Sequence, residues 1–198
     1  FFPLSPLYPS YKPDRLKVQV WNIWHGGRRF GKQVGVNRVI EVLKKENADV
    51  IGLIETYGSG AIIADSLGYY FYLISSNLSI MSRYPIDETI QLFRSFNSGG
   101  ALIRISEEQQ IAFYDIWLHY LPDVSDLNKG KAAVKKYEED EAQTRIPEIR
   151  EILKQMTPHT AQSAETPVIL VGDFNCDSHL DWNEQARPTH LGAFAKLE

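Results

Sequence analysis

Four kinds of polar side chain in this sequence follow directly on runs of apolar, strand-like residues. In sheet enzymes, groups at strand ends can converge in one crevice. A carboxylate at the end of a buried run is costly unless a cation or hydrogen-bond donors compensate it. Mg²⁺ prefers oxygen ligands and often takes only one or two carboxylates, with water and substrate phosphate completing its coordination. The residues that could provide such chemistry are Asn22, Glu55, His119, and Asp173 together with Asn175.

Each of these signals also has a structural explanation when it is taken alone. A strand-end carboxylate such as Glu55 is more often a cap or a salt-bridge partner than a metal ligand. His119 fits a hydrogen-bonded core histidine equally well, and Asn22 could satisfy a turn. The occurrence of all of them at the ends of apolar strands favours a functional site.

A glycine-rich segment follows the first predicted strand, in Trp24-His25-Gly26-Gly27. Its glycines would let the backbone approach a phosphate, with His25 as a substrate-binding residue. The same glycines fit a tight turn equally well. The sequence leaves both interpretations open.

The elements that must position these residues are predicted from hydrophobic periodicity. Residues 1–14 contain four prolines and are expected to form an extended lead-in to a domain covering 15–198. Strands and helices alternate in an order that implies a layered α/β sandwich. Strands are predicted at 16–24, 49–54, 69–74, 77–82, 86–94, 100–105, 110–119 and 167–171, and helices at 35–46, 61–67 and 141–156.

Length and composition restrict the class of protein. The chain has 198 residues, of which 43% are hydrophobic and 23% charged, which is ordinary for one globular domain. No apolar run approaches the roughly 20 residues of a transmembrane helix. The sequence does not indicate the oligomeric state. Because the chain begins with Phe1 rather than Met, an upstream segment is expected to be absent. A cleaved signal, implying a secreted or periplasmic protein, and excision from a longer chain both explain this.

Five motifs, in the right order from about Leu16 to Trp182, resemble the endonuclease/exonuclease/phosphatase superfamily of metal-dependent phosphoesterases, to which exonuclease III and DNase I belong. The most specific is Gly172-Asp173-Phe174-Asn175, and the acidic strand Asp49–Glu55 is the next. The others are Val20-Trp21-Asn22, Ser79–Ile86 and Trp117-Leu118-His119. A helix carrying Arg145, Glu148 and Ile152 stands where the family usually has one.

This resemblance implies a four-layered sandwich of two mixed sheets flanked by helices, and Mg²⁺-dependent hydrolysis of phosphate esters, with Mn²⁺ or Ca²⁺ as alternative ions. Glu55 would be the metal ligand, with Asn22 beside it. His119 would contact the scissile phosphate, Asp173 would orient or deprotonate the attacking water, and Asn175 would hold a phosphate oxygen or the water. Ser178 and His179, in a stretch similar to some bacterial members, would shape the substrate pocket.

The substrate class stays open at this stage, because members of this superfamily act on nucleic acids, lipids and small phosphodiesters. The net charge of −4 argues against tight binding of a duplex. The superfamily normally closes with an Asp-His pair, and only 25 residues follow Asp173. We therefore expect the C-terminal strands to be missing and the fragment to be poorly active. The alternative is a catalytically silent domain that uses the fold for binding.

Overall fold

The computed structural model describes residues 13–29, 31–123 and 131–178. Most of the predicted lead-in, residues 1–14, therefore lies outside the described residues. The chain divides into two compact units. The first consists of Phe1–Trp117 and Ile152–Asp173, and the second of Leu118–Glu151 and Phe174–Glu198.

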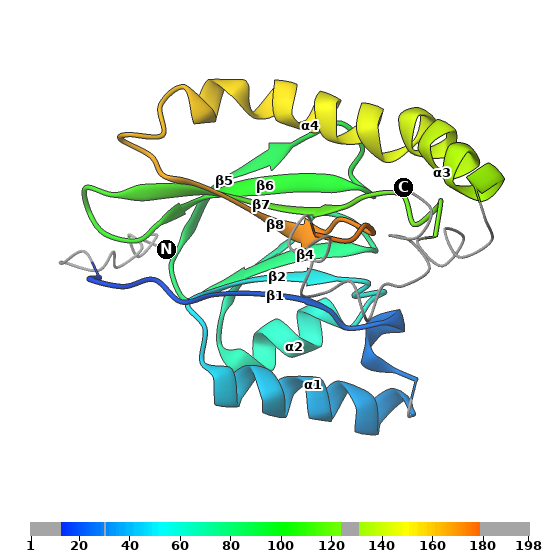
Figure 1. Ribbon diagram of the computed structural model, residues 1–198. Helices are drawn as coiled ribbons and strands as arrows, with labels where there is room; N and C mark the ends of the chain where they lie inside the picture. Colours follow the sequence, from blue (N-terminus) through cyan, green and yellow to red (C-terminus); the bar gives the residue numbers. More distant parts are fainter. Residues whose placement is uncertain (1–12, 30, 124–130, 179–198) are drawn as a thin grey trace. The chain divides into compact units, whose positions relative to one another are not determined.

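The first unit contains a four-stranded mixed sheet in the order β1-β2-β4-β3 (Figure 1). Its central strand β2 (Val50–Ile54) is buried at every position, as expected of a continuous apolar run. β1 (Val18–Asn22) runs parallel to β2 and β4 (Leu78–Ser82) antiparallel to it. β3 (Tyr70–Leu73) pairs antiparallel with β4, so the predicted strands 69–74 and 77–82 form a hairpin.

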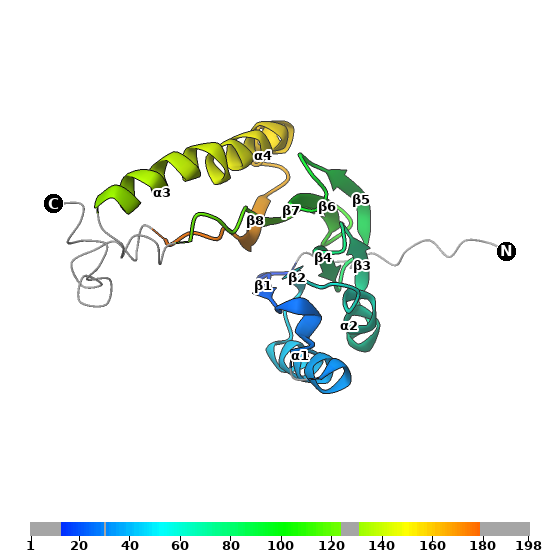
Figure 2. The same ribbon diagram turned by 90° about the vertical axis from the view of Figure 1, so that its right-hand side faces the viewer.

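Two helices pack on one face of this sheet, as Figures 1 and 2 show. α1 (Lys32–Glu46) places its apolar side chains at helical spacing against the sheet, and α2 (Gly60–Leu67) lies beside it. Together they enclose one hydrophobic core with the outer face of β2 and β4. Its members include Val36, Val39, Leu43, Ile51, Leu53, Ile63 and Met81.

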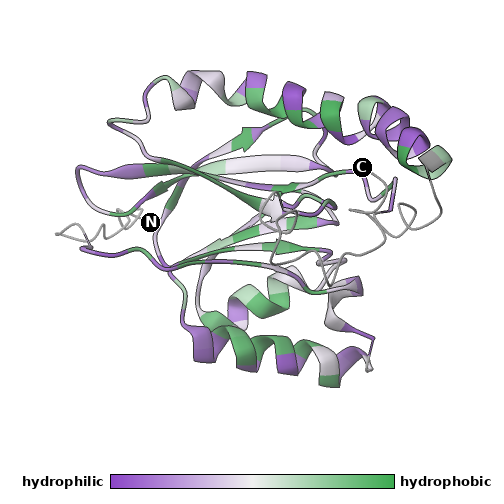
Figure 3. Ribbon diagram, in the orientation of Figure 1, coloured by the Kyte–Doolittle hydropathy of each residue, from purple (hydrophilic) through white to green (hydrophobic). Residues whose placement is uncertain are grey.

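The second sheet of this unit has the order β5-β6-β7-β8 and is also mixed. β5 (Ile86–Gln91), β6 (Ser98–Arg104) and β7 (Gln110–Trp117) are antiparallel neighbours, and β8 (Val168–Asp173) runs parallel to β7. Apolar residues run along the strands of both sheets in Figure 3. The facing sides of the two sheets form a second core, with Val50, Ile54, Ile80, Ile103 and Phe113 among its members.

A fourth layer covers the other side of the second sheet. It is formed by the Ile152–Thr160 part of α4 (Arg145–Thr160), in which Ile152 and Met156 are buried. The hydroxyl of Tyr114, on β7, is hydrogen-bonded to Nδ1 of His159. The first unit is therefore helix, sheet, sheet and helix, which confirms the predicted sandwich of two mixed sheets flanked by helices.

The predicted helix 141–156 is wrong in its boundaries. One helix, α3 (Lys131–Gln143), ends before Thr144, and α4 then continues to Thr160, four residues beyond the predicted end. The Thr144 hydroxyl lies 2.8 Å from the Asp140 carbonyl oxygen and 3.2 Å from that of Leu121, which marks the junction. The polar composition of 157–160 reflects exposure of the last turn. No helix of the described residues is long and apolar enough to cross a membrane.

Candidate functional site

Three strands of the first unit end side by side and bring Asn22, Glu55 and Asp173 together. Asn22 is the last residue of β1, Glu55 follows β2 directly, and Asp173 is the last residue of β8. The amide nitrogen of Asn22 donates to Oε1 of Glu55 at 3.0 Å and to Oδ2 of Asp173 at 2.9 Å. All three side chains are partly buried. One amide group therefore holds two carboxylates from different sheets at one edge.

The Glu55 carboxylate and backbone are both fixed by neighbouring loops. Oε2 of Glu55 accepts a hydrogen bond from the backbone N–H of His25 at 3.0 Å. The backbone N–H of Glu55 donates to Oδ1 of Asn77 at 3.2 Å, and its carbonyl accepts from Gly26 at 2.6 Å. These bonds orient the carboxylate before any ligand arrives, which is a requirement of a precise site.

The segment after β1 forms a tight turn, η1 (His25–Gly27). Both glycines have left-handed backbones, with φ of 68° at Gly26 and 70° at Gly27. A Cβ on Gly26 would lie 2.8 Å from the Thr56 carbonyl oxygen, and one on Gly27 would lie 2.9 Å from Cγ2 of Val39. The glycines thus allow close packing of the turn. The structure therefore shows a tight turn, and the role of His25 in substrate binding stays a prediction.

Unusual backbone conformations concentrate in the loops around Glu55. Positive φ is uncommon for non-glycine residues and is a genuine outlier for bulky ones. Such strain gathers at functional sites, where the surrounding structure must enforce it. Outside these loops, the described residues show it at Asn47, which ends α1, and at Asn175. The loop residues concerned are Trp24 (49°), His25 (49°), Glu55 (58°) and Tyr57 (37°).

Tyr57, which the sequence analysis did not single out, lies beside the candidate site. Its ring stacks on the imidazole of His25, with centroids 6.0 Å apart and planes 24° apart. Burial, and secondarily the charge of Glu55, raises the pKa of the Tyr57 hydroxyl above its usual range. The hydroxyl therefore stays protonated at neutral pH and can donate a hydrogen bond. The only indication of Tyr57 in the sequence was its position two residues after Glu55, the candidate metal ligand.

A third acid, Asp115 on β7, lies deeper between the two sheets. It is fully buried, and neither carboxylate oxygen forms a hydrogen bond of normal geometry with a described residue. A Cβ on Gly52 of β2 would lie 3.0 Å from its Oδ1, so the carboxyl group packs over that glycine. Burial raises the pKa of Asp115 well above its usual range, and the backbone N–H of Ile116 offsets this in part.

His119 and Asn175 lie in the second unit. β7 ends at Trp117, so His119 lies two residues beyond the strand that the sequence predicted to reach it. The Asn175 amide donates to the carbonyl of Leu118 at 2.8 Å. Nδ1 of His119 is 3.1 Å from both the backbone nitrogen and the carbonyl oxygen of Leu121. The second unit therefore brings Asn175 to the backbone next to His119.

Two buried charged residues of α4 fix the backbone of His119. Glu148 Oε2 accepts from the His119 N–H at 2.9 Å, and Arg145 Nη1 donates to the His119 carbonyl at 3.1 Å. Arg145 and Glu148 are only 3% and 7% exposed. The sequence analysis noted both residues without a role, although their i, i+3 spacing already places them on one helix face.

The remaining candidates are placed less informatively. Ser178 is exposed in the second unit, and His179 lies outside the described residues. Among the residues that the structure describes, no group of three or more His, Cys, Asp or Glu side chains is arranged to hold a metal ion. The oxygen atoms of Glu55 and Asp173 are nevertheless the donor type that a hard cation requires. The catalytic, metal and substrate roles of all these residues stay predictions.

Comparison with known proteins identifies the family. The sequence matches the Endonuclease/Exonuclease/phosphatase family over residues 20–193, and the chain therefore belongs to this family. It is 26% identical over 185 residues to the uncharacterized protein F14F9.5 of Caenorhabditis elegans. That match covers 88% of this chain and 58% of the relative, so the chain spans less than two thirds of the relative's length.

Solved structures share the fold. TDP2 of D. rerio, in a complex with single-strand DNA product, matches with a TM-score of 0.60 and 16% identity, over 86% of this chain and 65% of that one. ANGEL2, a 2′,3′-cyclic phosphatase, matches with a TM-score of 0.53 and 14% identity, over 81% of this chain and 52% of that one. At these identities the likeness establishes the fold and leaves the substrate to be determined.

Proposed function

We propose that the chain belongs to a Mg²⁺-dependent phosphodiesterase. The observation that carries this proposal is the Asn22 amide, which holds the carboxylates of Glu55 and Asp173 together at the ends of three strands. Family membership supports the same reaction class. TDP2 with a DNA product and the cyclic phosphatase ANGEL2 show that phosphodiester chemistry occurs on this fold.

The carboxylate of Glu55 would hold the metal ion. A bound Mg²⁺ supplies charge neutralisation at the phosphate and lowers the pKa of coordinated water. Mn²⁺ or Ca²⁺ would use the same oxygen donors. Asn22 points its amide nitrogen at both carboxylates, and an amide nitrogen donates hydrogen bonds. The geometry therefore favours an orienting role for Asn22 over the role of metal ligand.

The surrounding residues of the first unit would prepare the site for an in-line displacement. The backbone N–H of His25 holds one oxygen of Glu55, which leaves the orientation of that carboxylate fixed. Asp173 would accept a proton from the attacking water. The protonated Tyr57 hydroxyl would donate to a phosphate oxygen. Positioning of this kind supplies most of the rate enhancement in phosphoryl transfer.

The second unit carries two further candidate residues, His119 and Asn175. The family resemblance implies that His119 contacts the scissile phosphate. It implies that Asn175 holds a phosphate oxygen or the attacking water. In support, the backbone of His119 is fixed on both sides by Arg145 and Glu148. Nε2 of His119 forms no hydrogen bond with another residue of the described part of the chain, which leaves that nitrogen for a ligand.

A panel of phosphodiesters tests the proposal. The full-length protein should be assayed on single-stranded DNA, RNA, a 2′,3′-cyclic nucleotide, a phospholipid and a small aryl phosphodiester, each with Mg²⁺ and with EDTA. We expect hydrolysis of at least one substrate with Mg²⁺ and none with EDTA. Hydrolysis that EDTA leaves unchanged would contradict the metal requirement. No hydrolysis of any substrate would favour the silent binding domain.

A further inference from the structure

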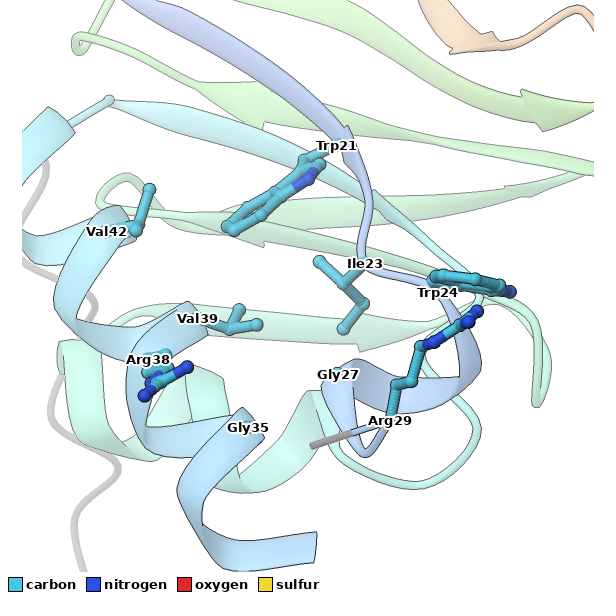
Figure 4. Close-up of a pocket in the computed structure, with 9 residues that line it drawn as sticks. All are labelled: Trp21, Ile23, Trp24, Gly27, Arg29, Gly35, Arg38, Val39 and Val42. Carbon is cyan, nitrogen blue, oxygen red and sulfur yellow. The ribbon is translucent and has the colours of Figure 1, made fainter. Parts of the chain in front are cut away.

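A pocket of about 230 Å³ lies on the outer side of the first sheet, between the end of β1, η1 and α1. Figure 4 shows its lining, with Trp24 and Arg29 on one side, Arg38 on α1 on the other, and Ile23 and Val39 between them. All of its residues belong to the first unit. We call it the Trp24 pocket.

The lining combines an apolar floor with aromatic faces. Ile23 and Val39 are buried, whereas Trp24 is 48% exposed. The guanidinium group of Arg29 lies 3.8 Å from the centroid of the Trp24 ring. An arginine stacked on an exposed indole forms a flat platform, and such platforms bind further planar groups by stacking.

The pocket lies in the most basic part of an acidic chain. Residues 28–45 contain six Lys and Arg residues and one Glu, whereas the whole chain has a net charge of −4. Within the described ranges, neither Arg29 nor Arg38 forms an ion pair. Two cations without acidic partners, on opposite sides of one apolar pocket, complement a ligand that is both planar and anionic.

The volume limits the size of that ligand. Pockets that enclose drug-sized molecules measure about 300–1,000 Å³, so 230 Å³ suits a single ring system. A pyrimidine base has this size, and the phosphate of its nucleotide would supply the negative charge. A membrane surface would instead require protruding apolar side chains, whereas Trp24 lies under Arg29 at the wall of a hollow.

The pocket shares a turn with the candidate site. The backbone N–H of Trp24 donates to Oδ1 of Asn22 at 2.9 Å, and the next residue, His25, donates to Glu55. The Trp24 backbone and the Glu55 carboxylate are therefore held by hydrogen bonds of consecutive residues of the β1–η1 turn. A ligand stacked on Trp24 would be fixed relative to Asn22 and Glu55.

We propose that the Trp24 pocket binds one nucleotide of a single-stranded nucleic acid, with the base stacked on Trp24 and its phosphate between Arg29 and Arg38. The pocket proposal names single-stranded nucleic acid as the substrate class of the proposed phosphodiesterase. Only this assignment of a substrate rests on the proposed function. Binding at the pocket requires neither the metal nor hydrolysis, so the two proposals can fail separately.

Binding without turnover tests the proposal. The full-length protein is titrated, in EDTA, with a 5′-phosphorylated oligothymidylate of five nucleotides and, separately, with dTMP, while tryptophan fluorescence is recorded. We expect quenching, and tighter binding of the oligonucleotide. Arg29→Ala, Arg38→Ala and Trp24→Leu should each weaken oligonucleotide binding about tenfold. Trp24→Phe should keep most of the affinity because it keeps an aromatic face.

Lys44→Ala is the matched control, because it removes one exposed positive charge from α1 without touching the pocket lining. It should change the affinity by less than about twofold. If Lys44→Ala and Arg38→Ala lowered the affinity for the oligonucleotide equally, the effect would come from overall charge alone, and the proposal would be overturned. Binding that is unchanged in all three pocket variants, equal affinity for dTMP and the oligonucleotide, or preference for anionic phosphatidylserine vesicles would also overturn it. Circular dichroism melting of each variant confirms that it is folded.

Discussion

Asp173 and Asp115 are acids of the same type on neighbouring strands of one sheet, yet their surroundings differ completely. Asp173 ends β8, is partly buried, and accepts a hydrogen bond from the Asn22 amide. Asp115 lies inside β7 and is fully buried, and no side chain among the described residues forms a hydrogen bond with its carboxylate. Their strands are paired in register, with Asp115 opposite Val171, two residues before Asp173.

The difference shows where this fold places chemistry. At the strand end, donors and solvent surround a carboxylate, so it can bind a cation or take a proton. Two residues deeper, burial favours the neutral form of the same side chain, and the group becomes a cost to stability. The comparison predicts that Asp173 governs the reaction and Asp115 governs the folding equilibrium.

The largest effect is expected for Asp173→Asn. Loss of a positioned acid or base typically slows a reaction by about 10²–10⁴-fold, or roughly 3–5 kcal/mol. We expect kcat on the preferred phosphodiester to fall by this factor while KM changes little, as steady-state kinetics will show. Asp115→Asn is the matched control and should retain most of the rate. If both variants slowed the reaction equally, the contrast between the two acids would fail.

A smaller effect is expected for Gly52→Ala, which tests the packing of Asp115. The added Cβ would lie 2.8 Å from Cγ2 of Val171 and 3.0 Å from Oδ1 of Asp115. Overpacking of this kind costs about 1–3 kcal/mol of unfolding free energy, which urea denaturation will measure. The second substitution Asp115→Ala in the same chain should recover part of this loss. If the losses of unfolding free energy from the two substitutions were additive in the double variant, Asp115 would not pack against Gly52.

The last prediction concerns the pH dependence of stability. Because burial raises the pKa of Asp115 in the folded state, the folded protein holds this proton above pH values at which the unfolded chain, with a pKa near 3.9, releases it. Asp115 therefore makes the unfolding free energy fall as pH rises above about 4, by at most about 1.4 kcal/mol per pH unit. Below the unfolded pKa this penalty is absent.

Asp115→Asn removes the titrating group, so its stability relative to the original protein should improve as pH rises from 4 to 8. Urea denaturation at several pH values measures this difference directly. The other carboxylates titrate in both proteins and cancel in the comparison. A difference that stays constant with pH would show that the Asp115 carboxyl is not held neutral by burial.

The sequence could predict the strand ends but could not show which groups meet there. The apolar runs before Asn22, Glu55 and Asp173 were enough to place all three at the ends of β1, β2 and β8. The bridge that the Asn22 amide makes between the two carboxylates depends on how two sheets pack. No periodicity within one strand contains that information.

Other features had a signal whose meaning depended on tertiary contacts. Asp115 alternates with Ile111, Phe113 and Trp117, so strand periodicity places it on the inner face of β7. The opposing Gly52, which leaves room for its carboxyl group, comes from the other sheet. In the same way, the contacts of Arg145 and Glu148 with His119 required knowledge of where α4 lies in the second unit.

The most direct test of the central claim is a Mg²⁺ titration of hydrolysis by the full-length protein and by its Glu55→Gln variant. Glu108→Gln, an exposed substitution in the β6–β7 turn, is the matched control. The claim predicts a rate at least about 10²-fold lower in Glu55→Gln and half-saturation at a much higher Mg²⁺ concentration, with Glu108→Gln unchanged. An unaltered rate and an unaltered Mg²⁺ titration in Glu55→Gln would contradict it.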